Sequence, residues 1–321
     1  MQAIRNNLPR RKFDGPVAPV RRWFVLIALA LAALAAILSP ITAHAQVNLF
    51  VSVNGDTVFT ASPGSVFEYT PAGMQITFAS GIKIGRPRGL AFDSRGNLFV
   101  GLGPLTPSDI SHGKLLKFNR LGQQSVLGNA ANHDGFEGVV TDSAGNVFAL
   151  ASSETFPFPG TIYKFTPDGT RTVFGDTPGQ SFGLAFDSAG NLYASDSGDV
   201  TIYKFTPSGA RTIFVGPSAF TSTQGPIGLA FDSAGNLFVS TEGNPGNDAI
   251  LKFTSDGLSE TTFATGLTQP RGLAFDGSGN LYVAETHADG DILEFTPAGG
   301  TGAVFASGIA RPEFLTFGPA R

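Results

Sequence analysis

Six positions in this chain could gather four charged and two apolar side chains around one site. Each position immediately precedes a short apolar run, and the runs are copies of one motif. We expect these residues to stand around the mouth of a central channel, so we call them the mouth residues. In chain order they are Arg88, Glu137, Phe182, Ile227, Arg271 and Glu313. Guanidinium groups can pair with carboxylates of the protein or grip a ligand's carboxylate or phosphate. The pattern predicts either ion pairs that neutralise the mouth or a site for a small anionic ligand. In that site Arg88 and Arg271 would hold the anion, and Phe182 and Ile227 would cover its apolar part.

A second set of residues could support acid–base catalysis. It comprises Glu137 and three acids near the end of the second apolar run of a copy, namely Asp196, Glu242 and Glu285. The histidines His112, His133 and His287 fall in connecting segments, where histidine is ordinarily polar surface. We find no Ser–His–Asp set, no histidine-rich metal spacing and no phosphate-binding loop in the sequence. The motifs therefore do not identify a reaction.

The motif that carries these residues is best seen in residues 182–195. Similar stretches begin at Arg88, Glu137, Ile227 and Arg271, and their marker aspartates lie roughly 45 residues apart, a period typical of repeat architectures. Each copy predicts two short strands joined by a tight Asp-x-x-Gly-Asn turn. The turn faintly resembles a calcium loop, but Ser-Ala or Ser-Arg stands where further oxygen ligands are needed, which favours a structural turn.

A second motif alternates with the first and completes each repeat. Residues 163–169 and 203–209 both read as a strand that ends in Thr-Pro-x-Gly, and a further short strand follows, as at residues 171–174. Four antiparallel strands within 40 to 50 residues are typical of a propeller blade.

The two ends of the array complement each other. Residues 48–52 match the second strand of a blade, and residues 311–317 match the first strand. We therefore predict an all-β, six-bladed β-propeller of four-stranded antiparallel blades, whose ring is closed when the C-terminal strand joins the N-terminal blade. The rival is a right-handed parallel β-helix, but its repeats are shorter and it would not split one unit between the chain ends.

Residues 1–45 read as a signal peptide, with cleavage before Gln46. Six basic residues precede the apolar run of residues 23–38, and Ala43-His44-Ala45 has the small-x-small pattern of a signal peptidase site. An uncleaved anchor extended through Ile41 is the alternative. The pair Arg21-Arg22 is similar to a twin-arginine signal, so the route is Sec-type or twin-arginine-type export. We expect a single domain at residues 46–321, in the periplasm or outside the cell.

Charge and composition limit the classes of partner that the protein could bind. Without residues 1–45 the chain keeps 15 basic and 24 acidic residues, a net charge near −9, which argues against nucleic-acid binding. The absence of cysteine excludes a disulfide framework and a cysteine nucleophile. We expect a monomer that binds a small anionic ligand or a protein partner, with membrane contact only through an uncleaved leader.

Two faces of the predicted ring differ in sequence. The Asp-x-x-Gly-Asn and Thr-Pro-x-Gly turns lie on one face, the turn face, and are nearly uniform. The connections between second and third strands, and those between blades, lie on the other, the connection face, and vary in length. Long examples are residues 101–113, 152–160, 216–225 and 243–248. Variable loops on a rigid scaffold commonly carry function, so we expect the site on the connection face, near the channel mouth.

Residues 48–317 resemble the six-bladed propellers of the NHL-repeat type and the related gluconolactonase and strictosidine-synthase-like families. The resemblance rests on Gly-Leu-Ala-Phe-Asp-x-x-Gly-Asn-Leu-Tyr-Val followed by Ile-Tyr-Lys-Phe-Thr-Pro-x-Gly. In gluconolactonase-like enzymes the mouth positions supply oxygen ligands to a divalent metal. Glu137 matches that pattern, and Glu313 does so more loosely.

The departures from that family pattern bear on function. Arg88 and Arg271 stand where neutral or anionic ligands belong, and arginines beside a divalent ion are electrostatically unfavourable. We therefore predict no cofactor and favour a binding or interaction scaffold. The alternative is a lactonase-like hydrolase that uses acids of the connection face, with calcium as the divalent cation to test.

Overall fold

The computed structural model describes residues 47–54, 64–80, 86–103, 113–130, 134–152, 159–220, 224–243 and 247–321. The predicted signal peptide, its cleavage position before Gln46, and His112 and His133 lie outside the described residues. Every described residue belongs to one compact unit, Ala45–Arg321.

The described residues form six antiparallel four-stranded sheets, which we number as blades from the N-terminus. The strands of each blade are given from the innermost outward. Blade 1 consists of β24 (Pro312–Pro319), β1 (Val47–Val53), β2 (Ser65–Tyr69) and β3 (Gln75–Ala79). Blade 2 consists of β4 (Arg86–Phe92), β5 (Leu98–Gly103), β6 (Lys114–Phe118) and β7 (Gln124–Asn129). Blade 3 consists of β8 (Gly135–Thr141), β9 (Val147–Ser152), β10 (Gly160–Phe165) and β11 (Arg171–Thr177).

Blade 4 consists of β12 (Ser181–Phe186), β13 (Leu192–Asp196), β14 (Thr201–Phe205) and β15 (Arg211–Val215). Blade 5 consists of β16 (Gln224–Phe231), β17 (Leu237–Gly243), β18 (Ala249–Phe253) and β19 (Glu260–Thr265). Blade 6 consists of β20 (Pro270–Phe275), β21 (Leu281–Glu285), β22 (Gly290–Phe295) and β23 (Ala303–Ile309).

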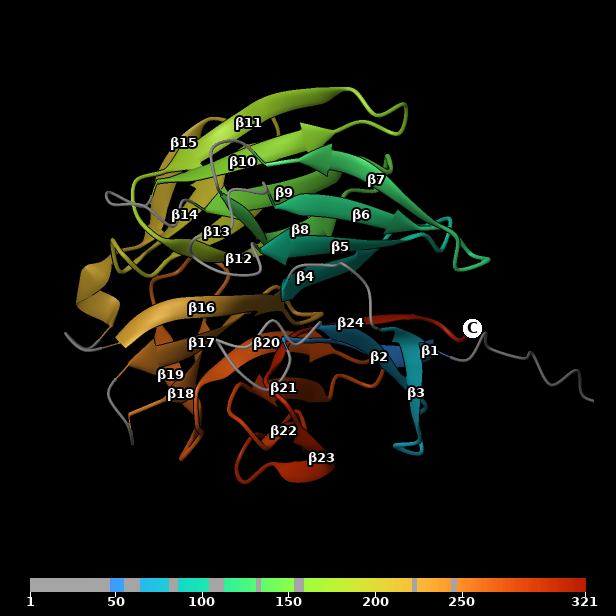
Figure 1. The fold of residues 1–321 in the computed structure, drawn as a ribbon. Coiled ribbons are helices and arrows are strands. Elements are labelled where there is room, and N and C mark those ends of the chain that lie inside the picture. The colour runs from blue at the N-terminus through green and yellow to red at the C-terminus, as the bar shows by residue number, and fades with distance from the viewer. Residues whose placement is uncertain are drawn as a thin grey trace, which may run out of the picture. The chain divides into compact units, whose positions relative to one another are not determined.

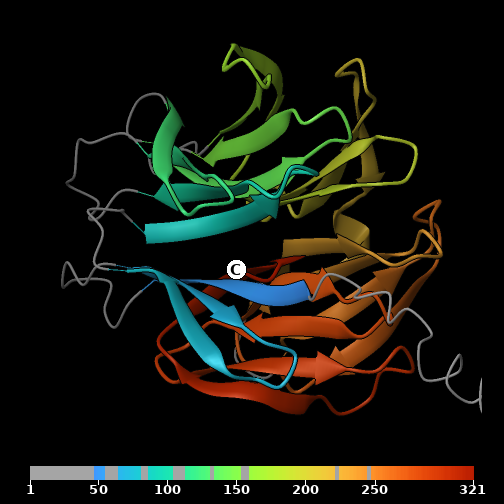
Figure 2. The ribbon, with the colours of Figure 1, turned by 90° about the vertical axis from the view of Figure 1, so that its right-hand side faces the viewer.

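The blades form a closed ring. Each innermost strand packs against the innermost strands of its two neighbours, in the cyclic order β24, β4, β8, β12, β16, β20 and back to β24. Figures 1 and 2 show blades 2 to 4, in green to yellow, in one half and the remaining blades in the other. Helix is limited, among the described residues, to one 3-10 turn at Pro217–Ala219. The predicted all-β propeller is confirmed.

Blade 1 combines the two ends of the domain. In Figure 1 the red β24 lies beside the blue β1, and the two pair antiparallel, with Val47 opposite Pro319 and Val51 opposite Leu315. The predicted closure is therefore correct. The C-terminal strand occupies the innermost place of its blade, where it contacts both β4 and β20.

The Asp-x-x-Gly-Asn segments are structural turns, as predicted. Asp93 shows the pattern: its Oδ1 accepts the backbone N–H groups of Arg95 and Asn97 at 3.0 and 2.8 Å, and its Oδ2 accepts the Asn97 side-chain amide at 2.7 Å. Gly96 completes the turn at φ +75°, a conformation that side chains disfavour. Since both carboxylate oxygens are engaged, these turns hold strands together rather than a cation.

Aromatic side chains join neighbouring blades. At five blade boundaries, a ring on the second strand packs edge-on against a ring on the fourth strand of its own blade and a ring on the first strand of the next blade. Phe148, for example, lies 4.9 Å from Phe174 and 5.1 Å from Phe186 between ring centroids. This edge-to-face geometry is favoured by the quadrupole of the rings. These aromatic side chains therefore form part of the core between blades.

Candidate functional site

The mouth residues all lie in β-bulges. The pairing between first and second strands shifts register at the mouth position in every blade, as between Pro87 and Leu90 or between Pro270 and Leu273. A bulge leaves a residue out of the ladder and redirects its side chain. Equivalent bulges therefore place the six mouth residues at equivalent points around the channel.

Close backbone packing then brings these points together. A Cβ on Gly89 would stand 2.5 Å from the carbonyl oxygen of Glu137, and a Cβ on Gly138 would stand 2.6 Å from that of Phe182. Only glycine allows inner strands to approach this closely. The glycine after the mouth position is thus what lets mouth residues of neighbouring blades meet.

Buried serines fix the same backbone in two blades. Ser195 accepts the N–H of Gly183 at 2.8 Å and donates to the carbonyl of Ile227 in the next blade at 2.5 Å. Ser240 makes the corresponding bonds to Gly228 and to the carbonyl of Arg271. These bonds hold the main chain on both sides of the mouth.

Arg88 is the centre of the first part of a charge network. Its Nη1 lies 3.3 Å from Glu137 Oε2 and 3.5 Å from Glu313 Oε2. All three residues are buried, at 8%, 5% and 2% exposure for Arg88, Glu137 and Glu313. Buried charges need partners because desolvation is costly. The alternating charges therefore form ion pairs between blades: Arg88 of blade 2 pairs with Glu313 of blade 1 and with Glu137 of blade 3.

Arg271 extends the network to blades 5 and 6. Its Nη1 donates to Glu313 Oε2 at 2.8 Å and its Nε donates to Glu242 Oε2 at 3.0 Å. Burial opposes ionisation of both Arg271 and Glu313. The charges of Glu313 and Glu242 nevertheless raise the pKa of Arg271, and those of Arg271 and Arg88 lower the pKa of Glu313. The network thus joins the three side chains of Glu137, Glu242 and Glu313 to those of Arg88 and Arg271.

The two apolar mouth residues differ in role. The ring centroid of Phe182 lies 5.9 Å from the Arg271 guanidinium carbon, so this side chain meets the network across the channel. Ile227 is buried at 3% exposure. Phe182 therefore borders the charged site.

The acids near the end of the second strand separate into two groups. Glu242 joins the network, whereas Asp196 accepts the N–H groups of Gly179 and Asp199 at 2.7 and 2.9 Å, and Glu285 accepts that of Thr268 at 2.6 Å. Burial raises the pKa of both Asp196 and Glu285. The structure therefore does not bring these two acids to the network, and they anchor connecting loops instead.

Their strand positions explain the separation. Asp196 pairs with Ser181 and Glu285 with Pro270, but the equivalent residue in blade 5 is Thr241, which pairs with Pro226. Glu242 is one residue further along. Because side chains alternate between the faces of a strand, this offset of one directs Glu242 differently from the other two acids.

Two participants were missed by sequence reasoning. Asn54 donates its side-chain amide to Glu313 Oε1 at 2.9 Å. Asp248 accepts the N–H groups of Gly243 at 3.0 Å and Gln269 at 2.8 Å, which holds the loop before Arg271. Asn54 stands one residue after Val53, which pairs with Pro312, just as Glu242 stands one residue after Thr241, which pairs with Pro226. This shared position was the available signal. His287 lies in the connection after β21, where its main chain bonds to Glu285 and Arg311.

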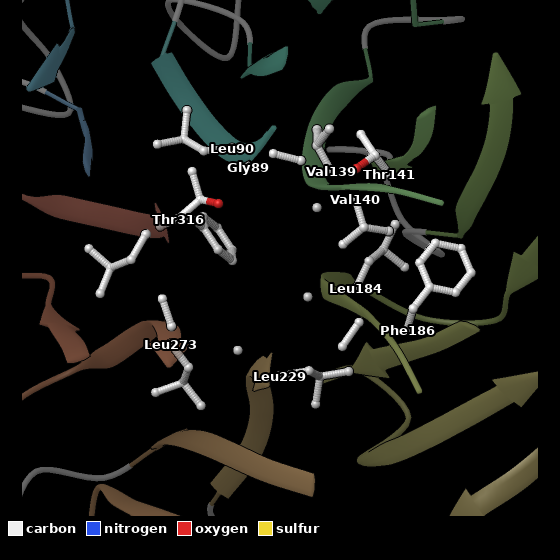
Figure 3. Close-up of a pocket in the computed structure, with 18 of the residues that line it drawn as sticks. Gly89, Leu90, Val139, Val140, Thr141, Leu184, Phe186, Leu229, Leu273 and Thr316 are labelled. Carbon is white, nitrogen blue, oxygen red and sulfur yellow. The ribbon is translucent and has the colours of Figure 1, made fainter. Parts of the chain in front are cut away.

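A cavity of about 400 Å³ lies within the ring. Its wall comes from the inner strands of all six blades, beginning at the glycines that follow the mouth residues, such as Gly89 and Gly138, and continuing to the ends of these strands, such as Phe92 and Phe317. Figure 3 shows the labelled side chains of these strands around the space. The mouth residues are not part of this wall, so the network lies at the end of the cavity toward the connection face.

Neither a metal centre nor a membrane span is seen within the described ranges. No three His, Cys, Asp or Glu side chains there gather as a metal ion would require. The same part of the chain contains no helix long and apolar enough to cross a bilayer.

Comparisons with known proteins bear on the fold. No family model and no curated protein matches the chain. Among solved structures, TolB from Acinetobacter baumannii is similar with a TM-score of 0.67 at 10% identity, covering 95% of this chain and 74% of that one. The chain has the fold of a six-bladed β-propeller.

Two other propellers are enzymes by description. Virginiamycin B lyase from Staphylococcus aureus has a TM-score of 0.56 at 18% identity, over 73% of this chain and 74% of that one. A provisionally assigned gluconolactonase has a TM-score of 0.55 at 16% identity, over 77% of this chain and 91% of that one. At such identities the likeness concerns the fold, because one fold hosts many functions.

Proposed function

We propose that this protein is an exported, NHL-like propeller that acts as a binding or interaction scaffold. Its ligand or partner would lie on the connection face, near the channel mouth. The observation that carries this proposal is the ion pairing of the mouth: Glu137 and Glu313, the residues that match metal positions in gluconolactonase-like enzymes, both lie against Arg88. A divalent ion would have to displace that guanidinium, which is electrostatically unfavourable.

The rigidity of the mouth supports a binding role. Bulges, glycine contacts and serine bonds fix the backbone on several sides, and the charged side chains fix one another. Sites held in this way lose little conformational entropy when a ligand binds. The proposed partner is a small anionic ligand or a protein, and the proposed location is the periplasm or the cell exterior, reached through the leader.

The alternative is a lactonase-like hydrolase. It is favoured by the structural likeness to the provisionally assigned gluconolactonase. Such an enzyme would use Glu137 with acids of the connection face, and it would need a divalent cation such as calcium at the mouth.

Thermal unfolding with and without millimolar calcium, magnesium or zinc, together with a lactone hydrolysis assay, separates the two. We expect no metal-dependent rise in melting temperature. A ligand at a hundredfold excess over its Kd stabilises the folded state by about 2.7 kcal/mol, so a metal site filled at that excess would raise the melting temperature measurably. Metal-dependent stabilisation and hydrolysis, both abolished by Glu137→Gln, would establish the hydrolase.

A positive test asks where ligands bind. A panel of small acids, sugars and peptides is screened by thermal shift against the parent, Arg88→Lys and Arg95→Lys. Arg95 is exposed at the tip of a turn on the opposite face, which makes it the matched control for the exchange of arginine for lysine. Binding that is weakened by Arg88→Lys but not by Arg95→Lys supports the scaffold. Ligands that respond only to Arg95→Lys would place the site on the wrong face.

A further inference from the structure

The two arginines of the network are not equally satisfied. Arg271 uses several nitrogens: Nη1 bonds to Glu313 at 2.8 Å, while Nε and Nη2 face the two oxygens of Glu242 at 3.0 and 3.5 Å. The fork of Arg271 is thus occupied by a carboxylate of the protein, in the side-on arrangement that guanidinium groups favour.

Arg88 is held more loosely. A single atom, Nη1, serves both Glu137 and Glu313, at 3.3 and 3.5 Å. Charge-assisted N–H···O bonds are ordinarily about 2.7–2.9 Å long, so both contacts are long. Among the described residues, the buried Arg88 guanidinium therefore meets its carboxylate partners only through long contacts.

The Nε atom of Arg88 has no hydrogen-bond partner within the part of the chain that the structure describes. It is buried, and the residue as a whole is 8% exposed. A buried donor left unsatisfied destabilises the folded state, so native proteins rarely keep one without a reason. Gly103 lies beside it: a Cβ there would stand 3.7 Å from Arg88 Nε. Because Gly103 has no side chain, it places no further group against this side of the guanidinium.

We propose that the Nε side of Arg88 receives the carboxylate of a small zwitterionic ligand. This inference rests on the proposed binding function and names its ligand class. The two oxygens of a carboxylate match adjacent guanidinium N–H groups in one plane, as Glu242 does on Arg271. Arg88 is then the ligand-binding arginine and Arg271 the structural one.

Charge balance selects a zwitterion over a simple anion. The network already holds three glutamates against two arginines, and a further carboxylate would add to this excess in a poorly solvated place. A ligand that brings its own ammonium group leaves the net charge unchanged. The ammonium would lie toward Glu137, the acid whose Oε2 is 3.3 Å from Arg88 Nη1.

The experiment adds one of three small molecules, free glycine, acetate or methylammonium, to the purified protein and measures binding by isothermal titration and thermal shift. We expect glycine to bind, acetate to bind more weakly and methylammonium to have no effect. Arg88→Lys keeps the charge but removes the fork, and it should weaken glycine binding by about tenfold or more, because the paired hydrogen bonds to the carboxylate are lost. Arg95→Lys, the matched exchange on the turn face, should leave glycine binding unchanged.

Four outcomes would overturn the inference. Glycine stabilisation that persists in Arg88→Lys would be a general solute effect. Equal binding of acetate and glycine would remove the charge-balance argument, and equal binding of methylammonium would assign the site to the acids. No response to any of the three would leave a water molecule as the partner of Nε.

The experiment separates this inference from the function on which it rests. If other members of the ligand panel bind at the connection face while glycine does not, the scaffold stands and the ligand class is wrong. If metal-dependent lactone hydrolysis appears, both fail. Should Arg88→Lys fail to fold, the double variant Arg88→Met with Glu137→Gln supplies a second form without the fork.

Discussion

Asn54 donates a hydrogen bond to Glu313 at 2.9 Å, although 259 positions separate the two residues. One follows the first described strand and the other lies in the last, so this bond and the β1–β24 pairing close the ring at the charged mouth. The same contacts therefore close the ring and assemble the candidate site.

Deleting Arg311–Arg321 should destabilise the propeller far more than an ordinary terminal truncation. The deletion removes the innermost strand of blade 1, which contacts the inner strands of blades 2 and 6, and it also removes Glu313. Thermal unfolding measures the effect. An unchanged melting temperature would contradict the closure.

Arg88→Met should lower the free energy of unfolding by about 1–3 kcal/mol, because it removes a countercharge from two buried carboxylates. The double change Arg88→Met with Glu137→Gln should recover much of that loss, since it also removes one of those charges. Urea unfolding of the parent, both single variants and the double variant gives the coupling. Additive effects would mean that the two side chains do not interact.

Glu313 predicts a pH dependence of stability. Its folded pKa lies below the unfolded value of 4.5, so its contribution is fully present above about pH 4.5 and is lost as pH falls through the folded pKa. Glu313→Gln should cost about 3–5 kcal/mol at pH 7, and the gap to the parent should narrow in acid. Urea unfolding from pH 7 to pH 3 measures this.

Asp176→Asn is the control for that experiment. Asp176 pairs with Arg211 at 2.7 Å, but its side chain is 74% exposed, so the pair should contribute little. A gap between the parent and Glu313→Gln that stayed constant with pH would show that Glu313 does not titrate with folding.

Gly89→Ala should destabilise the protein by about 1–3 kcal/mol, since the new methyl group would press on the carbonyl of Glu137 in the next blade. Gly277→Ala is the matched control because its Cβ would meet nothing within 4 Å. The two are compared by thermal unfolding. Equal effects would indicate that the inner strands are not packed backbone against backbone.

The amino-acid sequence by itself determined the architecture. Five Asp-x-x-Gly-Asn turns mark five blades, and the unit split between the two ends of the array supplies the sixth blade and predicts the closure. The mouth position was also visible, since it precedes the apolar run in every copy. A local pattern that recurs from blade to blade can be recognised in the amino-acid sequence alone.

The tertiary structure alone decided which acids reach the mouth. Asp196 and Glu285 anchor loops, while Glu242, one residue further along its strand, meets Arg271, and Asn54 arrives from the other end of the chain. A shift of one residue turns a side chain to the other face of a strand. Likewise, Arg88 and Arg271 are equivalent in sequence, and only the packing of neighbouring blades determines that one guanidinium is fully bonded and the other is not.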